Sequence, residues 1–136
     1  MAEIFFRGVY GCNPSIIDSL AVKDILISYP IFETIFGTPA LRGREAVRNF
    51  VDSFCSKWTE AQFTFHEAIA EKDQVVLMWT FSARNTGSIA GKQPDNQIHT
   101  WGGVSIFRFN SEGKIISEVG EESTPGPFER LQVKIN

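Results

Sequence analysis

The amino-acid sequence predicts one α+β domain, in which a cone-shaped, curved antiparallel sheet carries N-terminal helices on its concave face and encloses a pocket. Three observations predict this fold. Apolar residues at helical spacing are confined to the first part of the 136-residue chain. Long segments with strand-like alternation fill most of the rest, and strands of ten or more residues twist and curl strongly. Helices that precede a run of antiparallel strands pack on one face of their sheet, so a single domain spans residues 1–136.

Apolar periodicity and boundary residues define the expected helices. Residues 2–11 form a short helix that is ended by a glycine and buries a stripe of Ile4, Phe5 and Val9. A second short helix follows, with Asn13 as its N-cap and Pro14 at the first helical position, where the missing N–H does no harm. Residues 44–58 give the clearest signal, because their apolar residues recur at i, i+3, i+4 and i+7.

The expected strands are bounded by glycine, proline and short polar turns. Residues 72–73 (Lys-Asp) make a tight hairpin turn, and residues 31–40, which include Gly37 and Pro39, form an apolar loop. A Thr-Pro-Gly-Pro run at residues 124–127 stops the last strand, because proline cannot donate to a ladder. We expect strands at residues 24–29, 62–70, 74–86, 97–110 and 114–123.

Composition and charge narrow the classes of function. The net charge of -3 and the isoelectric point near 5.4 argue against a nucleic-acid partner, whose phosphates require clustered Lys and Arg. No apolar run approaches the roughly 20 residues that span a bilayer, and the chain begins with an acidic rather than a basic segment. We therefore expect a cytoplasmic protein that binds neither nucleic acid nor membrane.

The cysteines and histidines form no recognisable metal motif. Cys12 and Cys55 could form a disulfide, but two buried free thiols are the favoured interpretation, because disulfide frameworks contain more cysteines. His66 and His99 are far apart in the sequence, and neither a phosphate loop nor a nucleophile elbow occurs. We therefore expect no metal and no other cofactor.

Several segments in a fixed order resemble one known family. Residues 41–47 (Leu-Arg-Gly-Arg-Glu-Ala-Val) resemble the Gly-Arg-Glu helix start of SnoaL-like polyketide cyclases, in the nuclear transport factor 2-like superfamily. Residues 71–80 (Glu-Lys-Asp-Gln-Val-Val-Leu-Met-Trp-Thr) resemble their acidic hairpin ending in Val-Val-x-x-Trp, with Lys72 where glycine is usual. Residues 85–87 (Asn-Thr-Gly) resemble a His-Thr-Gly segment, and residues 103–115 fit the last two strands.

The resemblance extends over nearly the whole chain and implies a chemistry and an assembly. It implies cofactor-independent reactions on a hydrophobic secondary metabolite, and pairing of two chains into a homodimer. Family cyclases carry a catalytic Asp ten residues after the Gly of Gly-Lys-Ile, but that position is Ser123 here. The first helix is also interrupted, by Gly11 and Pro14, which indicates a differently shaped pocket mouth.

Strand alternation yields a candidate for the missing acid–base group, because neighbouring residues point to opposite faces. If Ile115 lines the cone, Glu121 reaches the apolar pocket, where desolvation favours the protonated form that a general acid requires. Ser123 shares this face and is expected to contact substrate. In the alternative interpretation Glu118, Glu121 and Glu122 form a solvated edge, since a bulge would exchange the two faces.

The two histidines are the other candidates for proton transfer. His99 with Trp101 on the same strand face suits a site for a ring-shaped ligand, while the alternative is a histidine in water at an open strand end. Strict alternation points His66 outward. Isomerases of the superfamily use a histidine near this place, however, so the resemblance implies a role in the pocket.

Three further side chains are expected to bind substrate. Tyr29 can donate its hydroxyl to a carbonyl oxygen, or it can serve as an aromatic plug beside Pro30. Trp79 shares a face with Leu77 and is expected to form a pocket wall. Arg42 can hold an anionic oxygen, or it can lie in water.

These candidates leave three classes of function. The first is a cofactor-free enzyme that transfers protons on a small hydrophobic carbonyl or polycyclic compound, as a cyclase, isomerase, dehydrating lyase or epoxide hydrolase. The second is a non-catalytic small-molecule-binding domain of the same fold, which the missing Asp favours. The third is a dimeric partner-binding module, for which the apolar residues 31–36 are the only hint.

Overall fold

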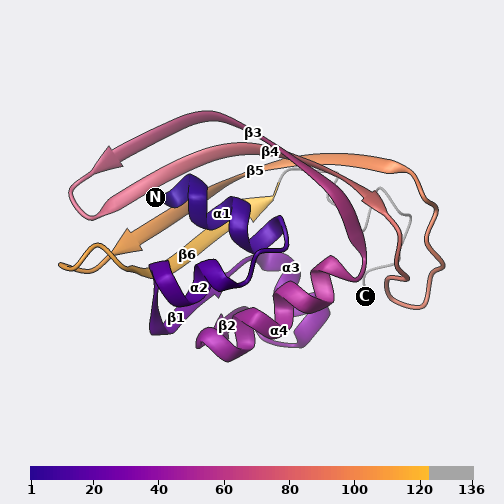
Figure 1. Ribbon diagram of the computed structural model, residues 1–136, viewed down its shortest axis with the longest axis horizontal. Coiled ribbons are helices and arrows are strands. Elements are labelled where there is room, and N and C mark those ends of the chain that lie inside the picture. The colour runs from indigo at the N-terminus through magenta and orange to yellow at the C-terminus, as the bar shows by residue number, and fades with distance from the viewer. Residues whose placement is uncertain (123–136) are drawn as a thin grey trace.

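A six-stranded sheet arches over the helices of the chain (Figure 1). The structure is a computed structural model that describes residues 1–122, except for the side chains of residues 34 and 35. The helices are α1 (Ala2–Tyr10), α2 (Ser15–Leu20), α3 (Pro30–Phe36) and α4 (Arg44–Cys55). The strands are β1 (Ala21–Ser28), β2 (Ala40–Arg42), β3 (Trp58–Glu71), β4 (Gln74–Asn85), β5 (Ile98–Phe109) and β6 (Ile115–Glu122). The strands lie in the order β2-β1-β6-β5-β4-β3.

The sheet is mixed rather than purely antiparallel. Strand β1 pairs with β6 in parallel, and the other neighbouring strands pair antiparallel. The long chain between β1 and β6 permits either direction, whereas the short β3–β4 connection permits only the antiparallel one. The predicted α+β class and the helices on the concave face are confirmed. The parallel pair corrects the expectation of an all-antiparallel sheet, and it places Ser28 beside Val119.

Helix α1 buries two residues of its predicted stripe, Phe5 and Val9. Phe6 and Tyr10 are buried, whereas Ile4, expected inside, is 56% exposed. Phe6 packs against Trp79 of β4 with 4.9 Å between the ring centroids, so α1 lies against the concave face of the sheet. Helix α2 begins one residue after Pro14 instead of at it.

The segment predicted as an apolar loop, residues 31–40, contains most of helix α3 and the start of strand β2 instead. Pro30 occupies the first helical position, and Gly37 ends the helix in the left-handed region with a φ of 71°. Proline at the first helical position and glycine after the last one are common helix boundaries. The apolar composition of the segment led to the prediction of a loop despite these boundaries. Phe32 of this helix is buried against Phe50 of α4, with 5.2 Å between the ring centroids.

Helix α4 confirms the clearest signal in the sequence but ends earlier than predicted. Val47 and Phe50 are buried on its inner side. Trp58 begins strand β3 rather than ending the helix. The Arg44 side chain donates to the carbonyl oxygen of Ala21 over 2.7 Å, which ties the start of α4 to the start of β1.

Strands β3, β4 and β5 form the long arch in Figure 1. The predicted hairpin turn between β3 and β4 is confirmed, with Lys72 at a φ of 57°. The β3–β4 register shifts between Phe65 and Glu67, and such a bulge bends the strand. The concave faces of β4 and β5 carry buried large apolar side chains, which are Leu77, Trp79, Phe81, Trp101 and Phe107.

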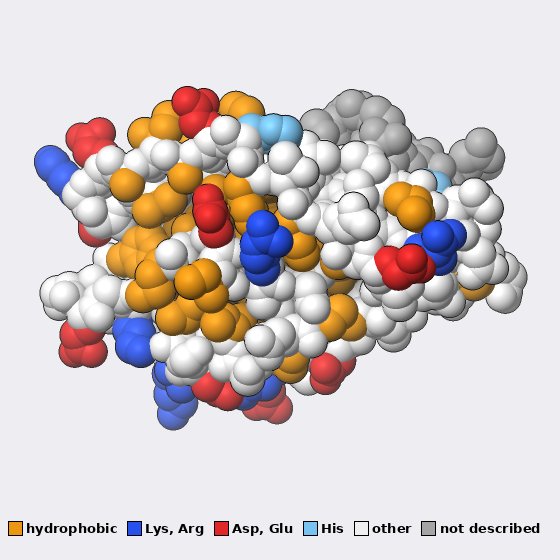
Figure 2. Space-filling model, turned by 45° about the horizontal axis from the view of Figure 1, so that its top comes forward, with side chains coloured by type: hydrophobic (Ala, Val, Ile, Leu, Met, Phe, Trp, Pro, Cys, Tyr) orange, Lys and Arg blue, Asp and Glu red, His pale blue; other side chains and the backbone are white. Residues whose placement is uncertain are grey.

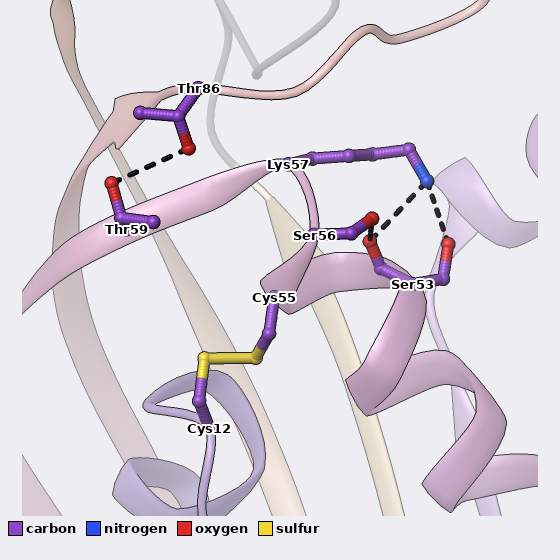
Figure 3. The surroundings of a disulfide bond; sticks show 7 residues. All are labelled: Cys12, Ser53, Cys55, Ser56, Lys57, Thr59 and Thr86. Atoms are coloured by element: carbon purple, nitrogen blue, oxygen red, sulfur yellow. Dashed lines mark hydrogen bonds between the residues drawn. A yellow bond between two sulfur atoms is a disulfide. The ribbon is translucent and has the colours of Figure 1, made fainter.

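A disulfide bond joins Cys12 and Cys55, which corrects the expectation of two free thiols (Figure 3). Cys12 follows α1, and Cys55 is the last residue of α4. They are 43 residues apart in sequence, but their Cα atoms are 5.9 Å apart. Such proximity depends on how the helices pack and is invisible to a spacing rule. The bond fixes the C-terminal end of α1 against α4.

Large apolar side chains also lie on the surface of the described residues. On the outer face of the sheet Met78, Val104 and Val119 are 44%, 40% and 38% exposed, on the neighbouring strands β4, β5 and β6. In Figure 2, which turns the top of the molecule forward, apolar side chains gather on one half of the visible surface, between charged ones. Within residues 1–122, no helix has the length and apolar character needed to cross a membrane.

Candidate functional site

Strand β6 carries a glutamate whose side chain is fully buried. Glu118 has no exposed surface, whereas Glu121, three residues further on, is exposed. The β5–β6 register shifts near the start of β6, where Ile116 has no partner. This bulge puts Ile115 and Glu118 together on the inner face and Glu121 on the outer face. The expectation that Glu121 points inward is therefore wrong, because simple alternation did not include the extra residue.

A chain of hydrogen bonds ends at Glu118. The hydroxyl of Tyr10 donates to Oε2 of Glu118 over 2.8 Å, and the hydroxyl of Tyr29 donates to the same oxygen over 2.5 Å. Ser105 Oγ lies 2.5 Å from the Tyr29 hydroxyl and accepts a hydrogen bond of 2.9 Å from the indole N–H of Trp79. We call these five residues the Glu118 cluster. Among the described residues, no hydrogen-bond partner reaches the buried Oε1 of Glu118.

Burial changes the acidity of the Glu118 cluster. Desolvation raises the pKa of Glu118 to about 7, although the hydrogen bonds from Tyr29 and Tyr10 oppose the shift. Burial, together with the negative charge of Glu118, raises the pKa of both tyrosines well above the ordinary value. Glu122, half-buried on the same face of β6, also has its pKa raised to about 7 by burial. A carboxyl group that titrates near neutral pH can both take and return a proton, which general acid–base catalysis requires.

Two glycines make room for the aromatic side chains of the cluster. A Cβ atom added at Gly120 would lie 2.3 Å from Cε1 of the Tyr29 ring. A Cβ atom added at Gly103 would lie 2.5 Å from Cζ2 of the Trp79 ring. Strands β5 and β6 thus omit side chains at the places where Trp79 and Tyr29 cross them, so the positions of both rings are tightly set.

A second polar pair lies near the start of β5. His99 Nε2 is 2.7 Å from Asp95 Oδ2, and the two side chains are 12% and 33% exposed. The ring of Trp58 packs edge-on against His99 at 5.9 Å between centroids, and Trp101 packs against Trp58 at 5.1 Å. Burial alone would raise the pKa of Asp95, but hydrogen bonds from the Gln97 backbone N–H and the His99 ring hold it below its ordinary value. We call Asp95 and His99 the His99 pair.

Four of the predicted site residues lie on the inner face of the sheet or beside it. Tyr29 and Trp79 belong to the Glu118 cluster, and His99 lies near Trp101 beside Trp58. The predicted inward position of Trp79 is confirmed. The Tyr29 hydroxyl was expected to donate to a substrate carbonyl. It donates a hydrogen bond to the carboxyl group of Glu118 instead.

The other predicted site residues lie elsewhere. His66 is exposed, and its Nε2 lies 2.7 Å from Oγ1 of Thr80 on the outer face, as strict alternation predicts. The pocket role that the resemblance implied for His66 is therefore not supported by its position. Arg42 is exposed at the end of the edge strand β2. Ser123 and the predicted stop at residues 124–127 lie outside the described residues.

Sequence reasoning did not select Tyr10, Ser105 or Glu118 as site residues. The i, i+4 spacing of Phe6 and Tyr10 is a signal that could have found Tyr10. Ser105 shares the predicted inner face of β5 with Trp101, and a lone hydroxyl among inward apolar residues was a usable clue. Glu118 has no local signal, because its orientation depends on a bulge formed with β5.

The curved sheet with helices on its concave face defines an α+β domain of the nuclear transport factor 2-like class. The chain belongs to the SnoaL-like domain family, whose family model matches residues 2–118. The resemblance inferred from the sequence is thereby confirmed. Among curated proteins, none matches this sequence.

Solved structures show the same fold at low sequence identity. TsrD from Streptomyces laurentii is 22% identical with a TM-score of 0.77, covering 98% of this chain and 92% of its own. A proposed polyketide cyclase from Acidithiobacillus ferrooxidans is 16% identical with a TM-score of 0.79, covering 96% and 91%. A Catenulispora acidiphila protein with a ketosteroid isomerase-like fold, in complex with trimethylamine, is 15% identical with a TM-score of 0.70, covering 94% and 88%. At these identities the likeness establishes the fold alone.

Proposed function

We propose that this protein is a cofactor-independent enzyme of the cyclase or isomerase type, with Glu118 as its acid–base residue. Its substrate would be a small hydrophobic carbonyl or polycyclic compound. The observation that carries the proposal is the buried Oε1 of Glu118, which has no partner among the described residues while Oε2 accepts two hydrogen bonds. Buried polar atoms are rarely left unpaired in folded proteins, so each such atom needs an explanation. We assign this free position to the proton that Glu118 exchanges with substrate.

The proposed reaction begins with proton transfer to Oε1. The C–H bond next to a substrate carbonyl breaks, an O–H bond forms on Glu118, and the electron pair moves to the carbonyl oxygen as an enolate. Glu118 then returns the proton to another carbon in an isomerisation, or to the alkoxide formed when the enolate attacks a second carbonyl in a cyclisation. Both routes balance without a cofactor. A positioned acid–base group contributes roughly 10²–10⁴-fold to such a rate.

The other residues of the Glu118 cluster support this chemistry. Hydrogen bonds from Tyr10 and Tyr29 stabilise the ionised form of Glu118, and they keep its pKa from rising further. Catalytic roles for Glu121 and His66 are not proposed again, because both side chains are exposed on the outer side of the sheet. His99 is retained as a second candidate for proton transfer.

Hydrogen exchange in D₂O tests the proposed proton transfer without knowledge of the natural substrate. The protein is incubated with a panel of polycyclic ketones, and deuterium next to the carbonyl is measured by mass spectrometry. We expect exchange with at least one ketone, and its loss in Glu118→Gln with ketone binding retained. Glu121→Gln is the matched control, since it makes the same change three residues away on the same strand. Unchanged exchange in Glu118→Gln contradicts the proposal, and ketone binding without any exchange favours a non-catalytic binding domain.

We also propose that two copies of the chain pair through the outer face of the sheet. The support is the exposed apolar set of Met78, Val104 and Val119 on three neighbouring strands, since contiguous exposed apolar surface marks interaction sites. Met78→Lys is expected to shift the molecular mass measured by light scattering from two chains to one. Ile4→Lys, at another exposed apolar position, on α1, is the control that leaves the mass unchanged. A single-chain mass for the unaltered protein would exclude this pairing.

The cytoplasmic location expected from the sequence stays a proposal. The Cys12–Cys55 disulfide weighs against it, because disulfides persist mainly in oxidising compartments. Alkylation of free thiols in intact cells, followed by mass spectrometry, would decide between the cytoplasm and an oxidising compartment. Two alkylated cysteines support the cytoplasm, and none supports an oxidising compartment.

A further inference from the structure

We propose that Trp79 and Ser105 are positioning residues, which direct the hydroxyl hydrogens of the Glu118 cluster toward Oε2 and so reserve Oε1 for the proton exchanged with substrate. This inference deepens the proposed function and rests on it. Neither Trp79 nor Ser105 forms a hydrogen bond with the carboxyl group of Glu118. Both act through Tyr29, which lies between Ser105 and Glu118.

The ionised carboxylate of Glu118 fixes the direction of each hydrogen bond in the cluster. A carboxylate only accepts, so Tyr29 must use its one hydroxyl hydrogen to reach Oε2. The 2.5 Å contact between Tyr29 and Ser105 then requires Ser105 to donate and the Tyr29 oxygen to accept. An indole N–H is only a donor, so the bond from Trp79 to Ser105 has a fixed direction. All three hydrogens therefore point the same way, from Trp79 toward Glu118.

This order makes each hydrogen bond support the next. In a chain of hydrogen bonds that run in one direction, every donor is polarised by the bond that it accepts. Ser105 is fully buried, and Trp79 and Tyr29 are 4% and 3% exposed. The cluster is thus a low-dielectric environment in which such polarisation is strong. Without the indole N–H, the Ser105 hydroxyl would lose the partner that fixes its rotation.

The two oxygens of Glu118 consequently differ. Oε2 receives hydrogen bonds from Tyr10 and from the chain that starts at Trp79. Oε1 receives none from the described residues. A proton that binds Glu118 therefore goes to Oε1, because protonation of Oε2 would compete with two hydrogen bonds. Oε1 is then the oxygen that takes a proton from substrate and returns it.

The titratable groups that face Glu118 are few among the described residues. They are Tyr10 from α1 and Tyr29 between β1 and α3, both of which stay neutral at ordinary pH because their pKa values are raised. Glu122 is on the same face of β6, and its own titration near neutral pH must be separated from that of Glu118. A Glu122→Gln background removes this overlap.

Carboxyl ¹³C NMR of protein labelled at the glutamate δ-carbons tests the proposal without any substrate. The Glu118 signal is assigned by its loss in Glu118→Gln, and its titration is followed in the Glu122→Gln background. Trp79→Phe and Ser105→Ala are each expected to raise the Glu118 pKa by about half to one pH unit, because the ionised form loses support. Trp101→Phe, which alters another buried indole on the inner face, is the control and leaves the Glu118 titration unchanged.

Each outcome has one meaning. An unchanged Glu118 titration in both folded variants overturns the positioning role, and circular dichroism establishes that they are folded. If one variant does not fold, the other carries the test. The exchange reaction in D₂O adds a pH profile, which should move to higher pH with the Glu118 titration. A failure of the proposed function would be seen in a different experiment, because deuterium exchange would then survive in Glu118→Gln.

Discussion

The Glu118 cluster and the His99 pair are two polar groups beside one sheet, with different surroundings. Glu118 has no exposed surface, and Tyr10 of α1 and Tyr29 at the start of α3 cover it. Asp95 and His99 keep 33% and 12% of their side chains exposed near a strand end. Burial therefore raises the pKa of Glu118 to about 7, while the pKa of Asp95 stays below its ordinary value. Enclosure by helices, rather than residue type, determines which carboxyl group can carry a proton near neutral pH.

The largest expected effect separates the two polar groups by activity. Glu118→Gln should reduce deuterium exchange into a responsive ketone by roughly 10²–10⁴-fold, because it removes the acid–base group. His99→Asn should reduce it less than about tenfold if Glu118 rather than His99 carries the exchanged proton. The measurement is the initial exchange rate at pH 7. The opposite ranking would assign the chemistry to the His99 pair.

The next largest effect concerns α1, the helix that carries Tyr10. The Cys12–Cys55 bond fixes this helix end across 43 residues of chain. Replacing both cysteines with serine should lower the free energy of unfolding by about 4 kcal/mol, on the loop-entropy scale for a loop of that size. Urea denaturation of the two proteins measures the difference. Unchanged stability in the double variant, or after reduction of the native protein, would show that packing alone holds α1.

Glu118 and Asp95 should change the free energy of unfolding with pH in opposite directions. The pKa of Glu118 rises from its ordinary 4.5 to about 7 on folding, so the folded state binds more protons between these values. Stability from Glu118 is present below pH 4.5 and falls by at most about 3 kcal/mol as the pH rises through 7. The lowered pKa of Asp95 acts in the opposite direction, at more acidic pH.

Denaturation midpoints at pH 5 and pH 8 measure this effect. Glu118→Gln should lose part of the decline between the two values, because Glu122 also titrates near pH 7 and keeps its own share. Glu121→Gln should keep the whole decline. Because all three proteins share the remaining acidic residues, the difference between them reports the titration of Glu118 alone. An equal decline in all three proteins would mean that Glu118 titrates as an exposed glutamate does.

The smallest expected effect is on the outer face. His66→Ala removes an exposed hydrogen bond to Thr80 and should change the free energy of unfolding by no more than about 0.5 kcal/mol. Deuterium exchange should also stay within twofold of the unaltered protein. A large loss of exchange would restore the role that the resemblance implied for His66.

The fold was predictable where local signals agree with tertiary packing. The apolar stripe of α4 and the β3–β4 hairpin follow from periodicity and from a short polar turn. Helix α3 was missed although Pro30 and Gly37 mark its ends, since apolar content at a surface segment resembled a loop. The disulfide was missed because its geometry arises only when α1 and α4 pack together.

The candidate site was predictable only in part. Tyr29 and Trp79 were selected from the residues alone, because a tyrosine at a strand end and an inward tryptophan are local features. Strand alternation predicts Glu121 on the inner face, whereas the structure places Glu118 there, because one unpaired residue in β6 reverses the faces of every residue after it. Such a bulge forms between two strands, so neither strand reveals it by itself.

The hydrogen bonds of the Glu118 cluster have a consequence for biosynthesis. They join residues 108, 89 and 76 positions apart in the chain, and contacts of such long range form slowly. On the ribosome, both tyrosines emerge long before β6, which must enter between β1 and β5 to complete the sheet. Until then, two unpaired strand edges offer templates for association with other chains. Chain release before β6 is complete should therefore yield aggregates rather than a shortened but working protein.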